Sequence, residues 1–392
     1  MTRSRNLLNF LGIITLSGII TISAENSQIK LVNVVFRHGD RTPDNIRAET
    51  YPTDPYRNYD YYPEGPSQLT NTGKKRSYEL GKVLRKQYNE FVGNVYMQDA
   101  VAARSTNMAR TKMSLLLVLA SLFPPFGGQK WNKNLPWQPI PTDYVPIAQD
   151  NILMPFFCPT YIAEVKKLLE TPAIKAKVME YDELMKNLTI LTQKNITTLP
   201  GLLSVYMTLS TQSSVDLNLP RWTRDYFPEG QLKEAAMLQY QLFSYDNNLK
   251  KRNAGMLLRE IIENMRSAMN APTNKRKIHL YSGHDVNVHG LLHNLGFNEP
   301  YIVQYSSAIL LELHTKKNNY YVKVLHYLGI PPVLKTLTIP GCEQLCSFDQ
   351  FIELTRDVIP TEDIPRQLDQ EKDITEQINS RIAQHPDKNS IF

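Results

Sequence analysis

Two short stretches of the sequence gather residue types that packing alone does not require. Residues 37–43 read RHGDRTP, so His38 lies between the guanidinium groups of Arg37 and Arg41. Residues 281–285 read YSGHD and end in His284 and Asp285. Paired guanidinium groups beside a glycine, which lets the backbone approach a ligand closely, offer several donors to a tetrahedral oxyanion. These types and spacings predict a site for a phosphate-like group.

Hydrolysis of a phosphate monoester is the reaction that this set of side chains can carry out. It needs positive charge on the phosphoryl oxygens, a nucleophile in line with the leaving oxygen, and a proton for that oxygen. Histidine is an accepted covalent nucleophile, so His38 is predicted to take the phosphoryl group. Asp285 is predicted to protonate the leaving oxygen, which acidic conditions favour. The predicted phosphate ligands are Arg37, Arg41, Arg104 and His284.

Two other phosphatase chemistries are excluded by the sequence. A cysteine phosphatase carries an arginine six residues after its nucleophile, but the residues six after the three cysteines are Glu164, Phe348 and Ile352. An aspartyl-phosphate enzyme of the Asp-x-Asp kind is excluded because no such triplet occurs.

A metal-dependent alternative stays open. A binuclear metal site could use His38, Asp40, His284 and Asp285, but the neighbouring arginines would repel the metal ions. His289 and His293 have the spacing of a metal-binding helix face, yet no third ligand is nearby in the sequence, so ordinary packing is favoured. No metal is therefore expected, and the absence of nucleotide-binding glycine motifs predicts no cofactor.

The elements that must position these groups form an α/β pattern. Residues 29–36 are nearly all apolar and β-branched, which is typical of a strand covered on both faces. A helix is predicted over residues 72–91, a strand over 99–103, and a second helix over 107–122 that Ser105 and Thr106 could cap. This β-α-β-α order predicts a doubly wound sheet, whose parallel strands bind ligands at their carboxyl ends.

A helical insertion is predicted to divide the α/β region. Helical patterns occupy residues 158–270, and strand patterns return at 277–281, 308–314, 320–327 and 333–339. We therefore predict a discontinuous α/β catalytic domain at residues 25–150 and 271–392, with a helical cap subdomain at 151–270.

The amino terminus predicts export. Two arginines, an apolar stretch and small residues ending at Ala24 have the order of a signal peptide at residues 1–24. No second apolar run is long enough to span a membrane, so no membrane anchor is expected. The sequons at Asn187 and Asn195 agree with secretion and predict a glycoprotein. The formal net charge of +6 is too small and too spread out to predict nucleic-acid binding.

Three cysteines fit an oxidising compartment. Cys342 and Cys346, which lie four residues apart after a Pro-Gly pair, could form a short local disulfide. Cys158 is then left over, either as a buried thiol or as a site for an intermolecular bridge.

The first string matches Arg-His-Gly-x-Arg-x-Pro at every fixed position, and His284-Asp285 completes a pair of motifs. With these motifs the sequence resembles the histidine acid phosphatases, the group that contains prostatic, lysosomal and insect venom acid phosphatases. The similarity extends over residues 30–360 and includes Arg104-Ser105-Thr106 and the spacing from Cys342 to Cys346. The insect venom and other secreted members look most similar.

The resemblance implies a phosphoglycerate mutase-like central sheet flanked by helices, with a mostly helical cap. It implies His38 as the phosphorylated nucleophile, Asp285 as proton donor, and Arg37, Arg41, Arg104 and His284 as phosphate ligands. Small phosphomonoesters are the expected substrates, with phosphotyrosine among them, and the location is extracellular or venom rather than the lysosomal lumen. Family members usually join the counterpart of Cys158 to a cysteine near the carboxyl terminus, which this chain lacks. A homodimer, a phytase-like specificity and a catalytically silent phosphate-binding protein stay open.

Overall fold

Strand β1 (Gln28–Arg37) lies at the centre of one large sheet, and seven of its ten residues are buried. The computed structural model describes residues 27–44, 49–271 and 275–364, so the predicted signal peptide lies outside the described residues. None of the helices within these ranges is long and apolar enough to cross a membrane.

The sheet has the order β3-β2-β4-β1-β5-β6-β7, with β8 beside β6. Strands β3, β2, β4 and β1 run parallel, whereas β5, β6 and β7 continue from β1 as an antiparallel meander. The predicted parallel sheet and meander are therefore confirmed. The remaining strand bounds are β2 (Val101–Thr106), β3 (Asp143–Val145), β4 (Ile278–Gly283), β5 (Ala308–Lys316), β6 (Asn319–Tyr327), β7 (Leu334–Leu337) and β8 (Cys346–Ser347).

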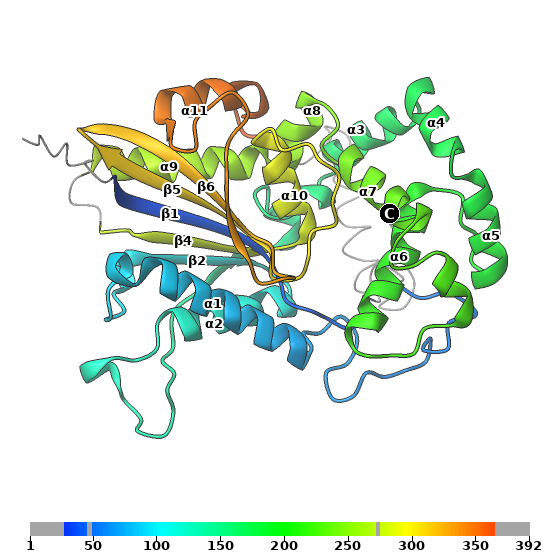
Figure 1. The fold of residues 1–392 in the computed structure, drawn as a ribbon, viewed down its shortest axis with the longest axis horizontal. Coiled ribbons are helices and arrows are strands. Elements are labelled where there is room, and N and C mark those ends of the chain that lie inside the picture. Colours follow the sequence, from blue (N-terminus) through cyan, green and yellow to red (C-terminus); the bar gives the residue numbers. More distant parts are fainter. Residues whose placement is uncertain (1–26, 45–48, 272–274, 365–392) are drawn as a thin grey trace, which may run out of the picture.

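Helices cover both faces of the sheet (Figure 1). Successive side chains of β1 point to opposite faces, so Val34 and Phe36 pack with α1 (Asn71–Val92) and α2 (Ala109–Leu122). Leu31 and Val35 pack on the other face in the cluster that includes α9 (Met256–Asn270), α10 (Asp285–Asn294) and α11 (Phe348–Thr355). The apolar character of β1 thus reflects burial on both sides.

A third hydrophobic cluster belongs to the helical cap on the right of Figure 1. Its helices are α3 (Pro159–Leu169), α4 (Pro172–Met179), α5 (Asp182–Thr192), α6 (Leu199–Ser214), α7 (Gln231–Leu242) and α8 (Asn247–Lys250). The shorter helical turns are η1 (Gln98–Ala100), η2 (Gly127–Gln129), η3 (Ile147–Gln149), η4 (Pro155–Phe157), η5 (Arg221–Asp225), η6 (Lys251–Gly255) and η7 (Arg356–Val358).

The structure differs from the predicted cap boundary at residue 270. Helix α9 contributes Leu257, Ile261 and Met265 to the sheet cluster rather than to the cap cluster. An amphipathic pattern shows that a helix buries one face, but it does not identify the partner of that face. Helix α9 therefore packs on the sheet, although the prediction places it in the cap.

The predicted cap of the second helix is also wrong. Ser105 and Thr106 belong to β2, and α2 begins after Met108 without a side-chain cap. The Thr106 hydroxyl instead lies 3.1 Å from His284 Nε2 and 2.8 Å from the Thr111 hydroxyl.

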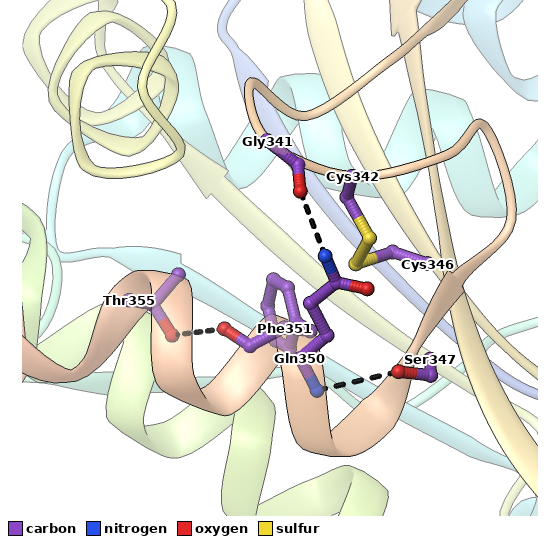
Figure 2. Close-up of a disulfide and its surroundings, with 7 residues drawn as sticks. All are labelled: Gly341, Cys342, Cys346, Ser347, Gln350, Phe351 and Thr355. Atoms are coloured by element: carbon purple, nitrogen blue, oxygen red, sulfur yellow. Dashed lines mark hydrogen bonds between the residues drawn. A yellow bond between two sulfur atoms is a disulfide. The ribbon is translucent and has the colours of Figure 1, made fainter.

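The predicted disulfide between Cys342 and Cys346 is present, with an S–S distance of 2.06 Å (Figure 2). It closes the turn before α11, where the Ser347 hydroxyl accepts from the Gln350 amide and the Gln350 side chain donates to Gly341 O. The Cys158 thiol is buried and lies 3.0 Å from the Thr160 hydroxyl.

We expect Gly81→Ala to destabilise the fold, because α1 and α2 approach closely at this position. An added Cβ would lie 2.0 Å from Ser121 Oγ and 2.3 Å from the backbone oxygen of Val118. Overpacking of this kind costs about 1–3 kcal/mol, which chemical denaturation can measure. Gly128→Ala is the matched control, since nothing lies within 4 Å of its added Cβ. Equal stabilities of the two variants would contradict this packing.

We expect the folded chain to lose stability as the pH falls from about 6.5 to 4, partly through His326. Burial, and then Lys335, lower the pKa of His326 to about 4, and its Nε2 lies 3.0 Å from the Ser307 hydroxyl. Below pH 6.5 the unfolded chain therefore binds a proton that the folded chain does not, which favours unfolding until the folded-state pKa is reached. Urea unfolding at pH 7 and pH 4.5 should show a smaller loss for His326→Gln than for the wild type. An identical loss in both proteins would rule out His326 as a contributor.

Candidate active site

The carboxyl ends of β1 and β4 bring the two predicted motifs together. Arg37, the last residue of β1, pairs in register with Gly283 of β4, and the His38 amide donates to Gly283 O over 3.0 Å. The rings of His38 and His284 lie 5.5 Å apart, and both residues are buried. The two motifs are far apart in the sequence, and the parallel register of β1 and β4 brings them together.

His38 presents a lone pair at Nε2. Its Nδ1 lies 2.7 Å from Gly39 O, and because a carbonyl oxygen can only accept, Nδ1 carries the proton. Nε2 consequently accepts a hydrogen bond from Arg110 Nε over 3.2 Å. Burial, followed by the charge of Arg110 and the neighbouring His284, holds the pKa of His38 well below its usual value. The lowered pKa favours the neutral imidazole, which keeps a nucleophilic nitrogen.

Arg37 and Arg41 have buried donors directed away from their protein partners. The Arg37 Nη1 donates to Val303 O over 2.5 Å, and its guanidinium stacks 3.9 Å from the ring centre of Tyr305. The terminal nitrogens of Arg41 donate to Glu49 over 2.6 and 2.7 Å. The Nε atoms of both arginines have no hydrogen-bond partner among the described residues. A buried donor without a partner costs about 1–3 kcal/mol, which an oxyanion ligand would relieve.

Arg110 is a site residue that the sequence prediction missed. It lies in the first turn of α2, is 3% exposed, and its Nη2 lies 3.1 Å from Asp44 Oδ2. Its contact with His38 Nε2 places it beside the predicted nucleophile. The available signal was its position, because a helix that follows a parallel strand begins at the ligand-binding edge of the sheet.

Arg104 is not brought into this cluster. It pairs in register with Tyr281, two residues before the end of β4, and its guanidinium binds Asp150 at 2.6 Å and Glu260 at 3.8 Å. It therefore lies farther than Arg37 from the carboxyl end of β4, and its guanidinium group is paired with acidic side chains outside the cluster.

His284 and Asp285 occupy the start of α10. The backbone amide of His284 donates to Asn287 Oδ1 over 2.8 Å, which fixes the turn from β4 into the helix. Asp285 Oδ1 accepts from the Val286 amide over 2.9 Å, and Oδ2 lies 3.1 Å from Arg37 Nη2. The carboxyl group is 3% exposed and stands at a helix amino terminus next to a guanidinium.

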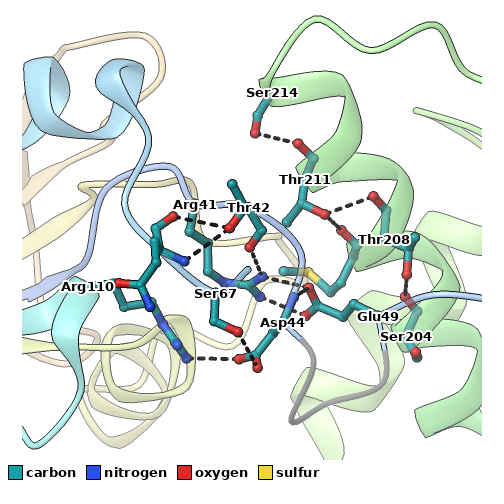
Figure 3. Close-up of polar contacts among 12 residues, drawn as sticks. Arg41, Thr42, Asp44, Glu49, Ser67, Arg110, Ser204, Thr208, Thr211 and Ser214 are labelled. Atoms are coloured by element: carbon teal, nitrogen blue, oxygen red, sulfur yellow. Dashed lines mark hydrogen bonds and ion pairs between the residues drawn. The ribbon is translucent and has the colours of Figure 1, made fainter. Parts of the chain in front are cut away.

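One polar network joins Arg110 to Arg41 (Figure 3). Asp44 accepts from Arg110 and from the Ser67 hydroxyl, its backbone amide donates to Glu49, and Glu49 accepts from Arg41. The site can thus hold a tetrahedral oxyanion in front of His38 Nε2 with Asp285 beside it.

Comparison with known proteins gives the family. The model of the histidine phosphatase superfamily (branch 2) matches residues 28–327. The chain is 43% identical to the venom acid phosphatase Acph-1 of Apis mellifera, with 88% of each chain covered. It is 34% identical to the human prostatic acid phosphatase, over 85% of this chain and 86% of that one.

Solved structures agree in fold. The Hafnia alvei phytase matches with a TM-score of 0.61 at 17% identity, over 85% of this chain and 97% of that chain. The phytase from Klebsiella sp. ASR1 matches with a TM-score of 0.62 at 16% identity, over 87% of this chain and 100% of that chain. From the family match and the identity to the acid phosphatases, this chain belongs to the histidine phosphatase superfamily, branch 2.

Proposed function

We propose that this chain is an acid phosphatase that hydrolyses phosphate monoesters through a phosphohistidine on His38. The observation that carries the proposal is the state of His38: Nδ1 is bound to Gly39 O, and Nε2 carries the lone pair beside buried guanidinium groups. The acid phosphatase relatives, which align over most of the chain, support the same reaction.

In the first step His38 Nε2 attacks phosphorus while the bond from phosphorus to the ester oxygen breaks. Asp285 gives its proton to the departing oxygen, so the product is an alcohol. In the second step the Asp285 carboxylate takes a proton from water, whose oxygen attacks phosphorus as the P–N bond breaks. Phosphate leaves, and both His38 and Asp285 return to their starting states.

The proposed phosphate ligands are Arg37, Arg41, Arg110 and His284. Three of them keep the sequence-based assignment, and Arg110 replaces Arg104 because it contacts His38 while Arg104 binds Asp150. Buried donors that need no reorganisation stabilise the charge that develops on the phosphoryl oxygens.

We also propose that the chain is secreted and glycosylated. The order of residues 1–24 supports a signal peptide, and the venom relative supports an exported protein. Asn195 is exposed and Asn187 is half-buried, so Asn195 is the more accessible acceptor. Cleavage after Ala24 and a glycan at Asn195 can be checked by mass spectrometry of the exported chain.

We expect p-nitrophenyl phosphate to be hydrolysed in acid and in the presence of EDTA. His38→Ala should abolish turnover, and Asp285→Asn should slow it by roughly 100-fold or more, because the leaving oxygen loses its proton donor. Release of p-nitrophenol measured from pH 4 to 8 gives both results. Loss of wild-type activity in EDTA would favour the metal site, and a folded but inactive wild type would favour a silent phosphate-binding protein.

We expect Arg110→Ala to reduce kcat/KM by about 100-fold or more, as for the loss of one preorganised donor to a transition state. Arg104→Ala removes the same charge outside the cluster and should reduce kcat/KM by less than about fivefold. Steady-state kinetics at one acidic pH compare the two. A larger loss from Arg104→Ala would restore the sequence-based assignment.

A further inference from the structure

Each guanidinium group at the proposed phosphate site has its own buried carboxylate. The three arginines lie within 3.1 Å of three acidic side chains that are at most 4% exposed. The pairs are Arg37 with Asp285, Arg41 with Glu49, and Arg110 with Asp44. The pairs of Arg41 with Glu49 and of Arg110 with Asp44 are formally neutral before any substrate enters, whereas Arg37 keeps its charge when Asp285 carries the proton for the leaving oxygen.

We propose that Glu49 is a specificity-determining residue that makes this site select the monoanionic form of a phosphate ester over the dianion. The inference rests on the proposed function, because it assigns the charge state of the substrate at that same phosphate site.

The geometry of Glu49 suits a fixed charge rather than a transient contact. Its two oxygens accept from both terminal nitrogens of Arg41, and Oε2 also accepts from the Asp44 amide over 2.9 Å. A paired carboxylate held by three donors at 3% exposure stays in place when a ligand arrives. Arg41 then offers its remaining Nε–H to a substrate oxygen, with its charge already compensated.

Among the residues that the structure describes, Lys194 is a further cation that interacts with Glu49. Lys194 from the cap, whose pKa is lowered by burial, donates to Thr50 O and to the Ser204 hydroxyl. Tyr305 also interacts with Glu49, and burial raises the pKa of Tyr305, so its phenol stays neutral in acid. The Asp44 carboxylate is turned to Arg110. Glu49 thus places a negative charge beside the donors that Arg41 offers to the substrate.

The charge of Glu49 matters because a phosphate monoester changes its own charge with pH. A phosphate monoester loses its second proton near pH 6, so the monoanion prevails in acid and the dianion above neutrality. Because Glu49 binds Arg41, a proposed phosphate ligand, its charge disfavours the extra charge of the dianion by roughly tenfold or more in affinity. Glu49 therefore contributes to acidic operation by discriminating against the dianion.

The test compares anions of one shape and different charge. Sulfate is a dianion from pH 5 to 8, whereas inorganic phosphate is mainly a monoanion at pH 5. Both anions are used as competitive inhibitors of p-nitrophenyl phosphate hydrolysis at pH 5, and the substitution Glu49→Gln should change their inhibition constants to different extents. We expect the inhibition constant of sulfate to fall roughly tenfold relative to that of phosphate. The alkaline limb of kcat/KM should move up by about one pH unit.

Asp150→Asn is the matched control. Asp150 is a buried carboxylate that binds Arg104 at 2.6 Å outside the cluster, so its removal should leave the ratio of the two inhibition constants unchanged. An unchanged ratio in Glu49→Gln, or an equal loss of affinity for both anions, would overturn the proposal, since Glu49 would then only position Arg41.

Two further comparisons keep the test decisive. If Glu49→Gln does not fold, two variants are compared instead: Arg41→Gln, which retains Glu49, and the double variant Arg41→Gln with Glu49→Gln. The inhibition constant of sulfate, relative to that of phosphate, should be higher in the variant that retains Glu49. Equal exclusion would overturn the proposal. If the folded wild type shows no turnover, the proposed function fails, and calorimetric binding of the two anions still tests the charge selection.

Discussion

The hydrogen bond from His38 Nδ1 to Gly39 O, 2.7 Å long, is the interaction on which the rest of the site depends. It fixes the tautomer, so Nε2 is the only ring nitrogen with a lone pair. Burial, and then the neighbouring cationic groups, lower the pKa of His38, which favours a lone pair free of a proton. A nucleophile that remains unprotonated can work beside Asp285, a carboxyl group that must be protonated to act as an acid.

Close packing around the loop that follows β1 positions His38. A Cβ on Gly39 would lie 2.2 Å from Gly73 O, so the loop after β1 can pass beneath the first turn of α1 only with glycine there. The Gly39 amide donates to Ser114 Oγ of α2, which ties the same loop to the next helix. Register between β1 and β4 sets the distance to His284. The packing of α1 and α2 on the sheet therefore fixes the position of the predicted nucleophile.

The sequence predicted the parts of this site that follow from strand ends. Arg37 and His284 stand where apolar strands stop, and parallel strands bring such positions to one edge. It misassigned the third guanidinium because Arg104 and Arg110 are both close to the end of β2, and only the side-chain directions distinguish them. It also missed Glu49, whose carboxylate binds Arg41, a contact that the sequence does not reveal. It assigned α9 to the cap because a helical pattern does not identify its packing partner.

The most direct test of the central claim is to trap the covalent intermediate. Enzyme mixed with substrate and quenched within milliseconds, then digested without acid to preserve the P–N bond, should yield a peptide with one phosphoryl group on His38. Asp285→Asn is expected to change the amount of this species but not its position. A turning-over enzyme with no phosphorylated peptide at any time, or with the label on another residue, would contradict nucleophilic catalysis by His38.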